Sequence, residues 1–100
     1  MNLHGIDFNI LKHLHSLLEE RSVSKAAKKS GITQPAMSKS LKKIREILND
    51  DILVENGSGY ALTEKASYLK PKVEEILKSM DGLLNPCEDF NPQKESAVIK

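Results

Sequence analysis

The chain has 100 residues, of which 39% are hydrophobic and only four are aromatic, so it can bury one modest core made mainly of aliphatic side chains. This composition favours small packed helices over an aromatic-rich sandwich or barrel. The single cysteine, Cys87, excludes an internal disulfide and most metal clusters, and the short apolar runs exclude a membrane span or a signal-peptide core. We therefore expect a soluble protein of the cytoplasm.

Positive charge is concentrated in one stretch of the chain. Residues 21–45 contain eight Lys and Arg residues and no Asp or Glu, whereas the rest of the chain carries the other seven of the 15 basic residues and all 14 acidic ones. A one-sided positive field attracts a polyanion, and nucleic acid is the partner that this pattern favours. The alternative is an ordinary solvated, lysine-rich surface.

The first helix is predicted to start at an Asp7 N-cap and to end before Arg21-Ser22. Its apolar residues recur at helical spacing on one face, at Ile10, Leu11, Leu14, Leu17 and Leu18. A short second helix, capped by Ser22 or Ser24, runs through Lys29, and its inward-facing Ala26-Ala27 pair lets another helix approach closely.

A Gly-Ile-Thr turn connects the second helix to a third. Gly31 suits the left-handed conformation that ends a helix, Thr33 is a good N-cap, and Pro35 falls in the first turn, where a missing N–H costs nothing. We expect this helix to run to about Leu48, with a buried stripe of Met37, Leu41, Ile44, Ile47 and Leu48 and a separate polar and basic face. This arrangement is typical of a helix-turn-helix.

Two short strands follow, Ile52–Glu55 and Tyr60–Leu62. The Asn56-Gly57-Ser58-Gly59 turn between them predicts a β-hairpin, which would form a wing. Residues 1–62 are therefore expected to form one mainly α domain, a winged helix-turn-helix with a three-helix core and a two-stranded wing.

A long helix is predicted over residues 63–84, capped by Thr63. Its apolar residues recur at alternating spacings of three and four, as in a heptad seam, at Ala66, Leu69, Val73, Ile76, Met80 and Leu83. We favour contact of this seam with a second copy of the chain. The alternative is packing on its own domain, at least in the first turns. Pro71 should bend the helix or free the carbonyl of Ser67.

The helical pattern of apolar residues ends at Asn85. Pro86, Pro92 and polar residues end the helix, and Ala97-Val98-Ile99 reads like the start of a strand. Residues 85–100 are therefore expected to be a hinge and the beginning of a truncated further domain.

The stretch Ser22–Leu41 carries a family pattern. Its Ala26-Ala27 pair, followed by Thr33-Gln34-Pro35-Ala36-Met37-Ser38, resembles the LysR-type transcriptional regulators of bacteria. The similarity continues to Leu62-Thr63, at the start of the family's linker helix, and to Phe90-Asn91-Pro92, at the opening of its effector-binding domain. The resemblance implies dimers, often pairs of dimers, that bind interrupted palindromes in double-stranded DNA and respond to a small ligand held by the missing domain.

The chain also departs from the family pattern. In the third predicted helix and just after it, the family usually has glutamine at Ser40, glutamate at Arg45 and glycine at Asn49. Further on, it usually has phenylalanine at Leu53, arginine at Glu55 and Ala-Gly at Lys65-Ala66. The acidic Glu55 argues against a phosphate contact from the first strand of the wing. Arg45 is a candidate to compensate for it.

A recognition helix enters the major groove N-terminus first, which assigns base reading to Gln34, Pro35, Ala36, Ser38 and Lys39. Gln34 can read adenine, Lys39 can reach guanine, and Pro35 or Ala36 can touch a thymine methyl. Phosphate contacts are assigned to Ser24, Lys25, Lys28, Thr33, Lys42, Lys43, Asn56 and Ser58. For the lysines the alternative is plain surface charge, and for Gln34 an ordinary exposed position.

Two other classes of function compete with DNA binding. A winged helix that mediates protein contacts should show an apolar surface where this chain has lysines. An enzyme would have to use His4, His13 or His15, to which we assign no Cys or carboxylate at ligand spacing, and Gly57-Ser58-Gly59 is too short for a phosphate loop. We predict a homodimeric, nucleoid-associated DNA-binding protein with no catalytic residue, cofactor, metal or membrane contact.

Overall fold

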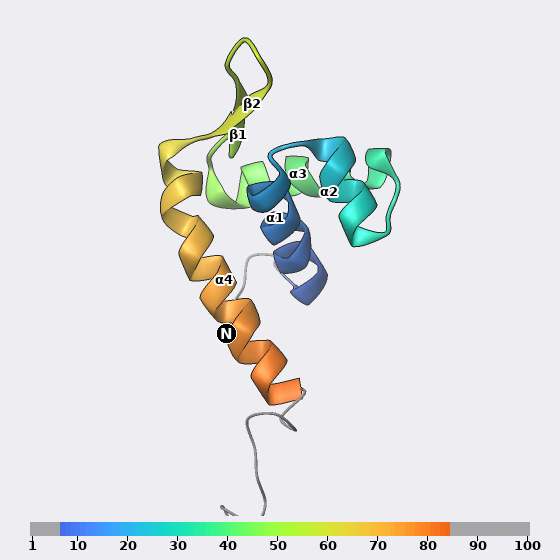
Figure 1. The fold of residues 1–100 in the computed structure, drawn as a ribbon, viewed down its shortest axis with the longest axis vertical. Helices are drawn as coiled ribbons and strands as arrows, with labels where there is room; N and C mark the ends of the chain where they lie inside the picture. The colour runs from blue at the N-terminus through green and yellow to red at the C-terminus, as the bar shows by residue number, and fades with distance from the viewer. Residues whose placement is uncertain (1–6, 85–100) are drawn as a thin grey trace, which may run out of the picture.

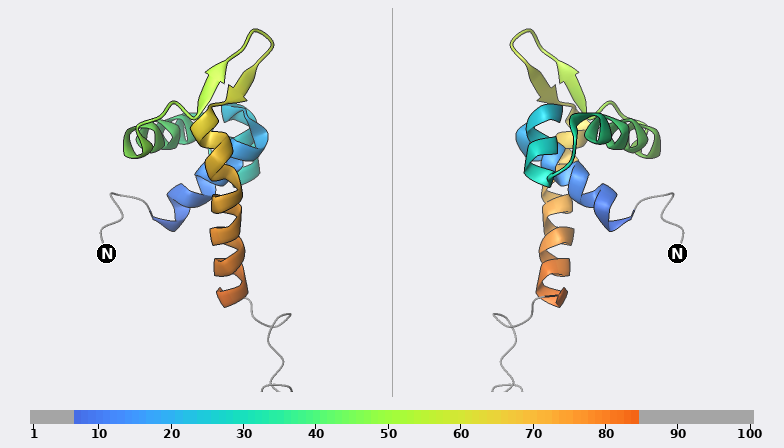
Figure 2. Two further views of the ribbon diagram at one scale, coloured as in Figure 1. Left: turned by 90° about the vertical axis from the view of Figure 1, so that its left-hand side faces the viewer. Right: turned by 90° about the vertical axis from the view of Figure 1, so that its right-hand side faces the viewer.

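The computed structural model describes residues 7–84. Four helices and one hairpin follow in the order α1 (Phe8–Glu20), α2 (Val23–Ser30), α3 (Gln34–Leu48), β1 (Leu53–Glu55), β2 (Tyr60–Leu62) and α4 (Glu64–Leu84). Helices α1 to α3 cluster together, the hairpin projects from them, and α4 passes α1 and extends beyond it (Figures 1 and 2). This confirms the predicted winged helix-turn-helix followed by a long helix. The predicted hinge and truncated domain at residues 85–100 lie outside the described residues.

The first three helices start at the caps predicted from the sequence. A side-chain oxygen accepts a hydrogen bond from the backbone N–H three residues later in each case: Asp7 from Ile10 at 2.8 Å, Ser22 from Lys25 at 3.2 Å, and Thr33 from Ala36 at 3.2 Å. Such bonds satisfy one of the free N–H groups of a helix start. Of the two predicted caps of α2, Ser22 is therefore the one used.

The same helices end at residues in the left-handed region. These are Arg21 (φ 53°), Gly31 (φ 72°) and Asn49 (φ 53°). Glycine adopts this conformation without strain and asparagine tolerates it, whereas arginine has no such advantage. Asn49 therefore fills the place where the family usually has glycine.

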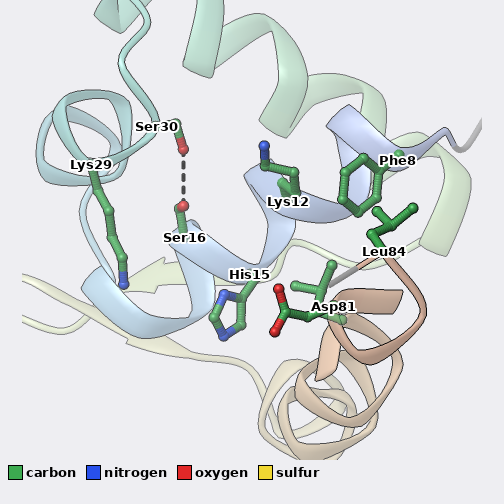
Figure 3. A pocket seen from close by; sticks show the side chains of 9 residues that line it. Phe8, Lys12, His15, Ser16, Lys29, Ser30, Asp81 and Leu84 are labelled. Atoms are coloured by element: carbon green, nitrogen blue, oxygen red, sulfur yellow. Dashed lines mark hydrogen bonds between the residues drawn. The ribbon is translucent and has the colours of Figure 1, made fainter. Parts of the chain in front are cut away.

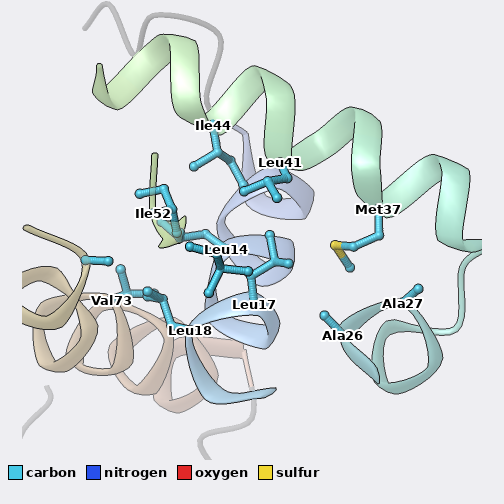
Figure 4. Packing of buried hydrophobic residues seen from close by; sticks show 12 residues of the cluster. Leu14, Leu17, Leu18, Ala26, Ala27, Met37, Leu41, Ile44, Ile52 and Val73 are labelled. Atoms are coloured by element: carbon cyan, nitrogen blue, oxygen red, sulfur yellow. The ribbon is translucent and has the colours of Figure 1, made fainter. Parts of the chain in front are cut away.

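The core lies where α1 meets α2, α3 and the start of the wing (Figure 4). Its largest fully buried side chains are Leu17, Leu18, Met37, Ile44 and Ile52. Met37 points from α3 toward Ala26 on α2, so the small alanine makes room for it as predicted. Leu41 completes the buried stripe of α3, whereas Ile47 and Leu48 are only half-buried.

The first half of α4 packs on its own domain. Ala66 is 0% and Val73 5% exposed, and both belong to the core cluster of this chain. These two residues therefore follow the alternative, in which the first turns of α4 pack on their own domain, and the dimer contact of the seam stays a prediction. Further along, Ile76 is 47% and Leu83 77% exposed. The helix continues through Pro71, which cannot donate to the carbonyl of Ser67.

A network of polar contacts joins α3, β1 and α4. One oxygen of Asp50 accepts from the Ile52 N–H at 2.9 Å and from the Thr63 hydroxyl at 2.5 Å. The Thr63 oxygen in turn accepts from the Ala66 N–H at 3.0 Å and so caps α4 as predicted. Ile52 has a φ of 67°, a strained value for a β-branched residue. Its complete burial and the Asp50 contact hold it there.

Candidate nucleic-acid interface

The N-terminal half of α3 presents the residues predicted to read bases. Gln34, Pro35, Ala36, Ser38 and Lys39 are all exposed. Their exposure follows from the burial of Met37 and Leu41, which fixes the rotation of α3 about its axis and turns the other face outward. The described structure thus leaves this face accessible, and its contacts with bases stay a prediction.

The residues predicted to contact phosphate are also exposed, on three elements. They are Ser24, Lys25 and Lys28 on α2, Thr33, Lys42 and Lys43 at the start and along the length of α3, and Asn56 and Ser58 in the wing. Thr33 serves as the α3 cap, and the Ser24 hydroxyl lies 3.2 Å from that of Ser22.

The wing and the start of α2 face each other across an open hollow of about 470 Å³. Lys25 lines it from α2, and Asn56 and Ser58 line it from the wing. Residues more than thirty positions apart in the chain are thereby brought to one concave surface. Glu20 lies on the same surface, so its charge is not uniformly positive.

The basic stretch of residues 21–45 divides into two groups in three dimensions. Lys29 pairs with Glu19 and Glu20 on α1, away from the exposed face of α3. Arg45 donates from Nε to the Asp51 carbonyl at 2.8 Å and from Nη2 to the Leu53 carbonyl at 3.4 Å. Arg45 thus braces the start of the wing, and the expectation that it compensates for Glu55 at DNA is not supported.

Five lysines remain for an outer partner. Lys25, Lys28, Lys39, Lys42 and Lys43 are exposed, and none of them forms a salt bridge within residues 7–84. Unpaired surface lysines on adjacent helices produce a positive field that neighbouring carboxylates do not cancel. The charge predicted from the sequence is therefore available, but in a smaller set than the full stretch.

Two side-chain hydrogen bonds connect α1 to α3 and to α2. His13 Nδ1 lies 2.8 Å from the hydroxyl of Ser40, which is only 8% exposed. Burial is the main cause that lowers the pKa of His13. The Ser16 and Ser30 hydroxyls are 2.9 Å apart (Figure 3). The sequence held a signal for Ser40, since it lies three residues after Met37 and four before Ile44 on the buried stripe.

The assignment of His15 as a surface histidine without a carboxylate partner is wrong. Its Nε2 atom is 3.4 Å from Glu19, four residues later on α1, and 3.9 Å from Glu74 on α4. The i, i+4 spacing of His15 and Glu19 was visible in the sequence. The contact of His15 with Glu74 was not visible in the sequence, because only the packing of α4 on α1 brings the two residues together.

No helix within residues 7–84 has the length and apolar content needed to cross a bilayer.

Comparison with known proteins assigns this fold to a family. The pattern of the family described as "Bacterial regulatory helix-turn-helix protein, lysR family" matches residues 8–67. Among curated proteins, Nodulation protein D of Azorhizobium caulinodans is 34% identical over 100 residues, which are 100% of this chain and 32% of that protein. The transcriptional activator NagR of a Ralstonia species is 39% identical over 92 residues, which are 92% of this chain and 31% of that protein. The chain spans about a third of the length of these relatives.

Solved structures show the same fold. A probable transcriptional regulator, PA0477 from Pseudomonas aeruginosa, superposes with a TM-score of 0.77 at 28% identity and covers 90% of this chain and 30% of that one. The BenM_DBD/benA site 1 DNA complex superposes with a TM-score of 0.73 at 21% identity, over 84% of this chain and 94% of that one. Because the family pattern covers more than half of the chain, the protein belongs to the lysR family of bacterial regulatory helix-turn-helix proteins.

Proposed function

We propose that this chain is the DNA-binding part of a transcription regulator, which inserts the N-terminal half of α3 into the major groove of double-stranded DNA. The observation that carries the proposal is the outward face of α3, where Gln34, Ser38 and Lys39 are exposed beside buried Met37. Relatives named as transcriptional regulators and similar folds solved with DNA support it. We propose no catalytic role for the described residues.

The first turns of α3 are proposed to read bases. Gln34 presents an amide that can donate to and accept from adenine, and Lys39 can donate to guanine O6 and N7. The Pro35 ring and the Ala36 methyl group are apolar and suit the methyl group of thymine. Ser38, one turn after Gln34, lies on the same row of α3 and can donate or accept. A short set of contacts of this kind specifies only a few base pairs.

The lysines and the wing are proposed to contact the DNA backbone. Lys42 and Lys43 extend the exposed face of α3, and Lys25 and Lys28 supply charge from α2. Ser24 and Thr33 can donate hydroxyl hydrogen bonds, while Asn56 and Ser58 can reach the backbone or the adjacent minor groove. If all five unpaired lysines neutralise phosphates, counterion release gives a slope of log K against log salt of about −4.5 per chain.

Two copies are proposed to act together through the outer part of α4. Ile76 and Leu83 are exposed there, with half-buried Leu69 and Met80 on the same side of the helix. Covering this apolar surface with a second copy removes it from water and places two recognition helices on one DNA site. An interrupted palindrome matches such a pair. We also propose association into tetramers and a response to a small effector, by analogy with relatives that are about three times as long as the matched part.

The proposal is tested by titrating DNA duplexes, selected from genomic fragments, with the chain at several salt concentrations. We expect enrichment of fragments that share a two-part sequence and a steep loss of affinity with added salt. A chain that captures no DNA at low salt, or that binds independently of salt, contradicts the proposal and favours the protein-contact alternative.

A further inference from the structure

Three side chains with metal-binding atoms from two helices meet at one point of the surface. His15 and Glu19 lie one turn apart on α1, and Glu74 joins them from α4. His15 Nε2 is 3.4 Å from Glu19 Oε2 and 3.9 Å from Glu74 Oε2, and one ligand atom of each residue lies within 4.8 Å of the other two. The DNA-binding surface proposed above does not include any of the three.

The spacing of these atoms suits a small tetrahedral ion. Zinc binds imidazole nitrogen and carboxylate oxygen at about 2.0–2.2 Å, which places neighbouring ligands of a tetrahedron about 3.4 Å apart. The His15–Glu19 pair already has this separation. The Glu74 side chain is 43% exposed, so it has the rotameric freedom to close the remaining gap. Three protein ligands would leave a fourth position for water.

The donor set at this site favours an ion that binds well to imidazole nitrogen. Lys29 binds Oε1 of Glu19 and so leaves Oε2 directed toward His15. The cluster therefore offers one imidazole nitrogen and two carboxylates, one of them shared with Lys29. Mg²⁺ and Ca²⁺ depend on a surplus of oxygen ligands, whereas Zn²⁺ gains from nitrogen coordination.

We propose that His15, Glu19 and Glu74 bind one divalent transition-metal ion, with zinc as the first choice, and that the ion clips α4 to α1. In the described structure, His15 contacts both carboxylates. A bound ion replaces these weak, partly exposed contacts with coordinate bonds. The second half of α4 extends beyond the winged domain. The clip would therefore fix the angle between the winged domain and this part of α4.

The test is calorimetric titration of the chain with ZnCl2 and, separately, with MgCl2 at neutral pH. All proteins carry Cys87→Ser, so that the thiol does not compete for zinc. We expect one zinc ion per chain and no response to magnesium. Glu74→Gln preserves size and polarity at a partly exposed position. It should weaken zinc binding at least tenfold, because even the loss of a hydrogen-bond partner of a metal ligand typically costs about 10–100-fold in metal affinity. Glu75→Gln, at an exposed neighbouring position outside the cluster, should bind zinc like the parent chain.

A second measurement identifies the ligand atoms in the folded protein. Zinc should shift the nitrogen NMR resonance of His15 Nε2 and leave that of His13, which is engaged by Ser40, unchanged. Zinc should also raise the Tm of the parent chain and of Glu75→Gln, but not that of Glu74→Gln. The proposal is overturned if zinc does not bind, if Glu74→Gln binds it as tightly as Glu75→Gln, or if the shift appears at another histidine.

Discussion

Replacing Arg21 by glycine should stabilise the protein, although Arg21 lies in the basic stretch. Arg21 ends α1 with φ 53° and ψ 34°, and its N–H donates to the Leu17 carbonyl at 2.8 Å. Left-handed backbone costs an L-residue about 1–2 kcal/mol. Glycine removes that strain but loses about 0.5–1 kcal/mol more backbone entropy on folding. The net gain in the free energy of unfolding is about 0.5–1 kcal/mol.

This gain is measurable by thermal or urea unfolding. For a domain of this size, 1 kcal/mol corresponds to a rise in Tm of about 4–8 °C. Arg21→Ala is the matched control, because it removes the same side chain and charge but keeps the Cβ atom that causes the strain. We expect Arg21→Ala to unfold near the parent temperature. Equal stabilisation by alanine and glycine would refute the reasoning, since the effect would then come from charge.

Three further changes test other parts of the structure. Burial lowers the pKa of His13 below its ordinary value of 6.5, so the unfolded chain binds the proton more tightly than the folded one. The free energy of unfolding should therefore fall as the pH drops below 6.5 through the folded-state pKa. His13→Gln should remove this loss in pH-dependent unfolding curves, and an unchanged loss of stability at low pH would contradict the explanation. Lys42→Gln should weaken binding to all duplexes alike and reduce the slope of log K against log salt by about 0.9 per chain. Lys78→Gln on α4 is the control and should leave this slope unchanged. A changed sequence preference in Lys42→Gln would count against a phosphate role. Ile76→Glu should shift sedimentation toward the monomer, because Ile76 is exposed on the proposed contact surface. Ser67→Glu, on the opposite side of α4, should not change sedimentation. A dimer that survives Ile76→Glu would place the contact elsewhere.

Local features of the fold were predictable because neighbouring residues determine them. Asp7, Ser22 and Thr33 cap helices through bonds to N–H groups three residues away, and Gly31 closes α2 in the conformation that glycine favours. The buried stripe through Met37 followed from helical periodicity, which in turn fixed the exposed face of α3.

Features that depend on packing between distant segments were not predictable in the same way. Periodicity showed that Ala66 and Val73 share a side of α4, but not that α1 rather than a second copy covers them. Charge counting treated Arg45 as surface, whereas the path of the chain into β1 brings two backbone carbonyls within its reach. Glu74 reaches His15 only because α4 lies along α1.

The most direct test of the DNA-reading surface compares the base preferences of the parent chain and Gln34→Ala on a randomised duplex library. If the exposed start of α3 lies in the major groove, Gln34→Ala should relax preference at one position of each half-site by about 1–3 kcal/mol and leave the other positions intact. Unchanged preference at every position would contradict this account, because it would place the exposed face of α3 away from the bases.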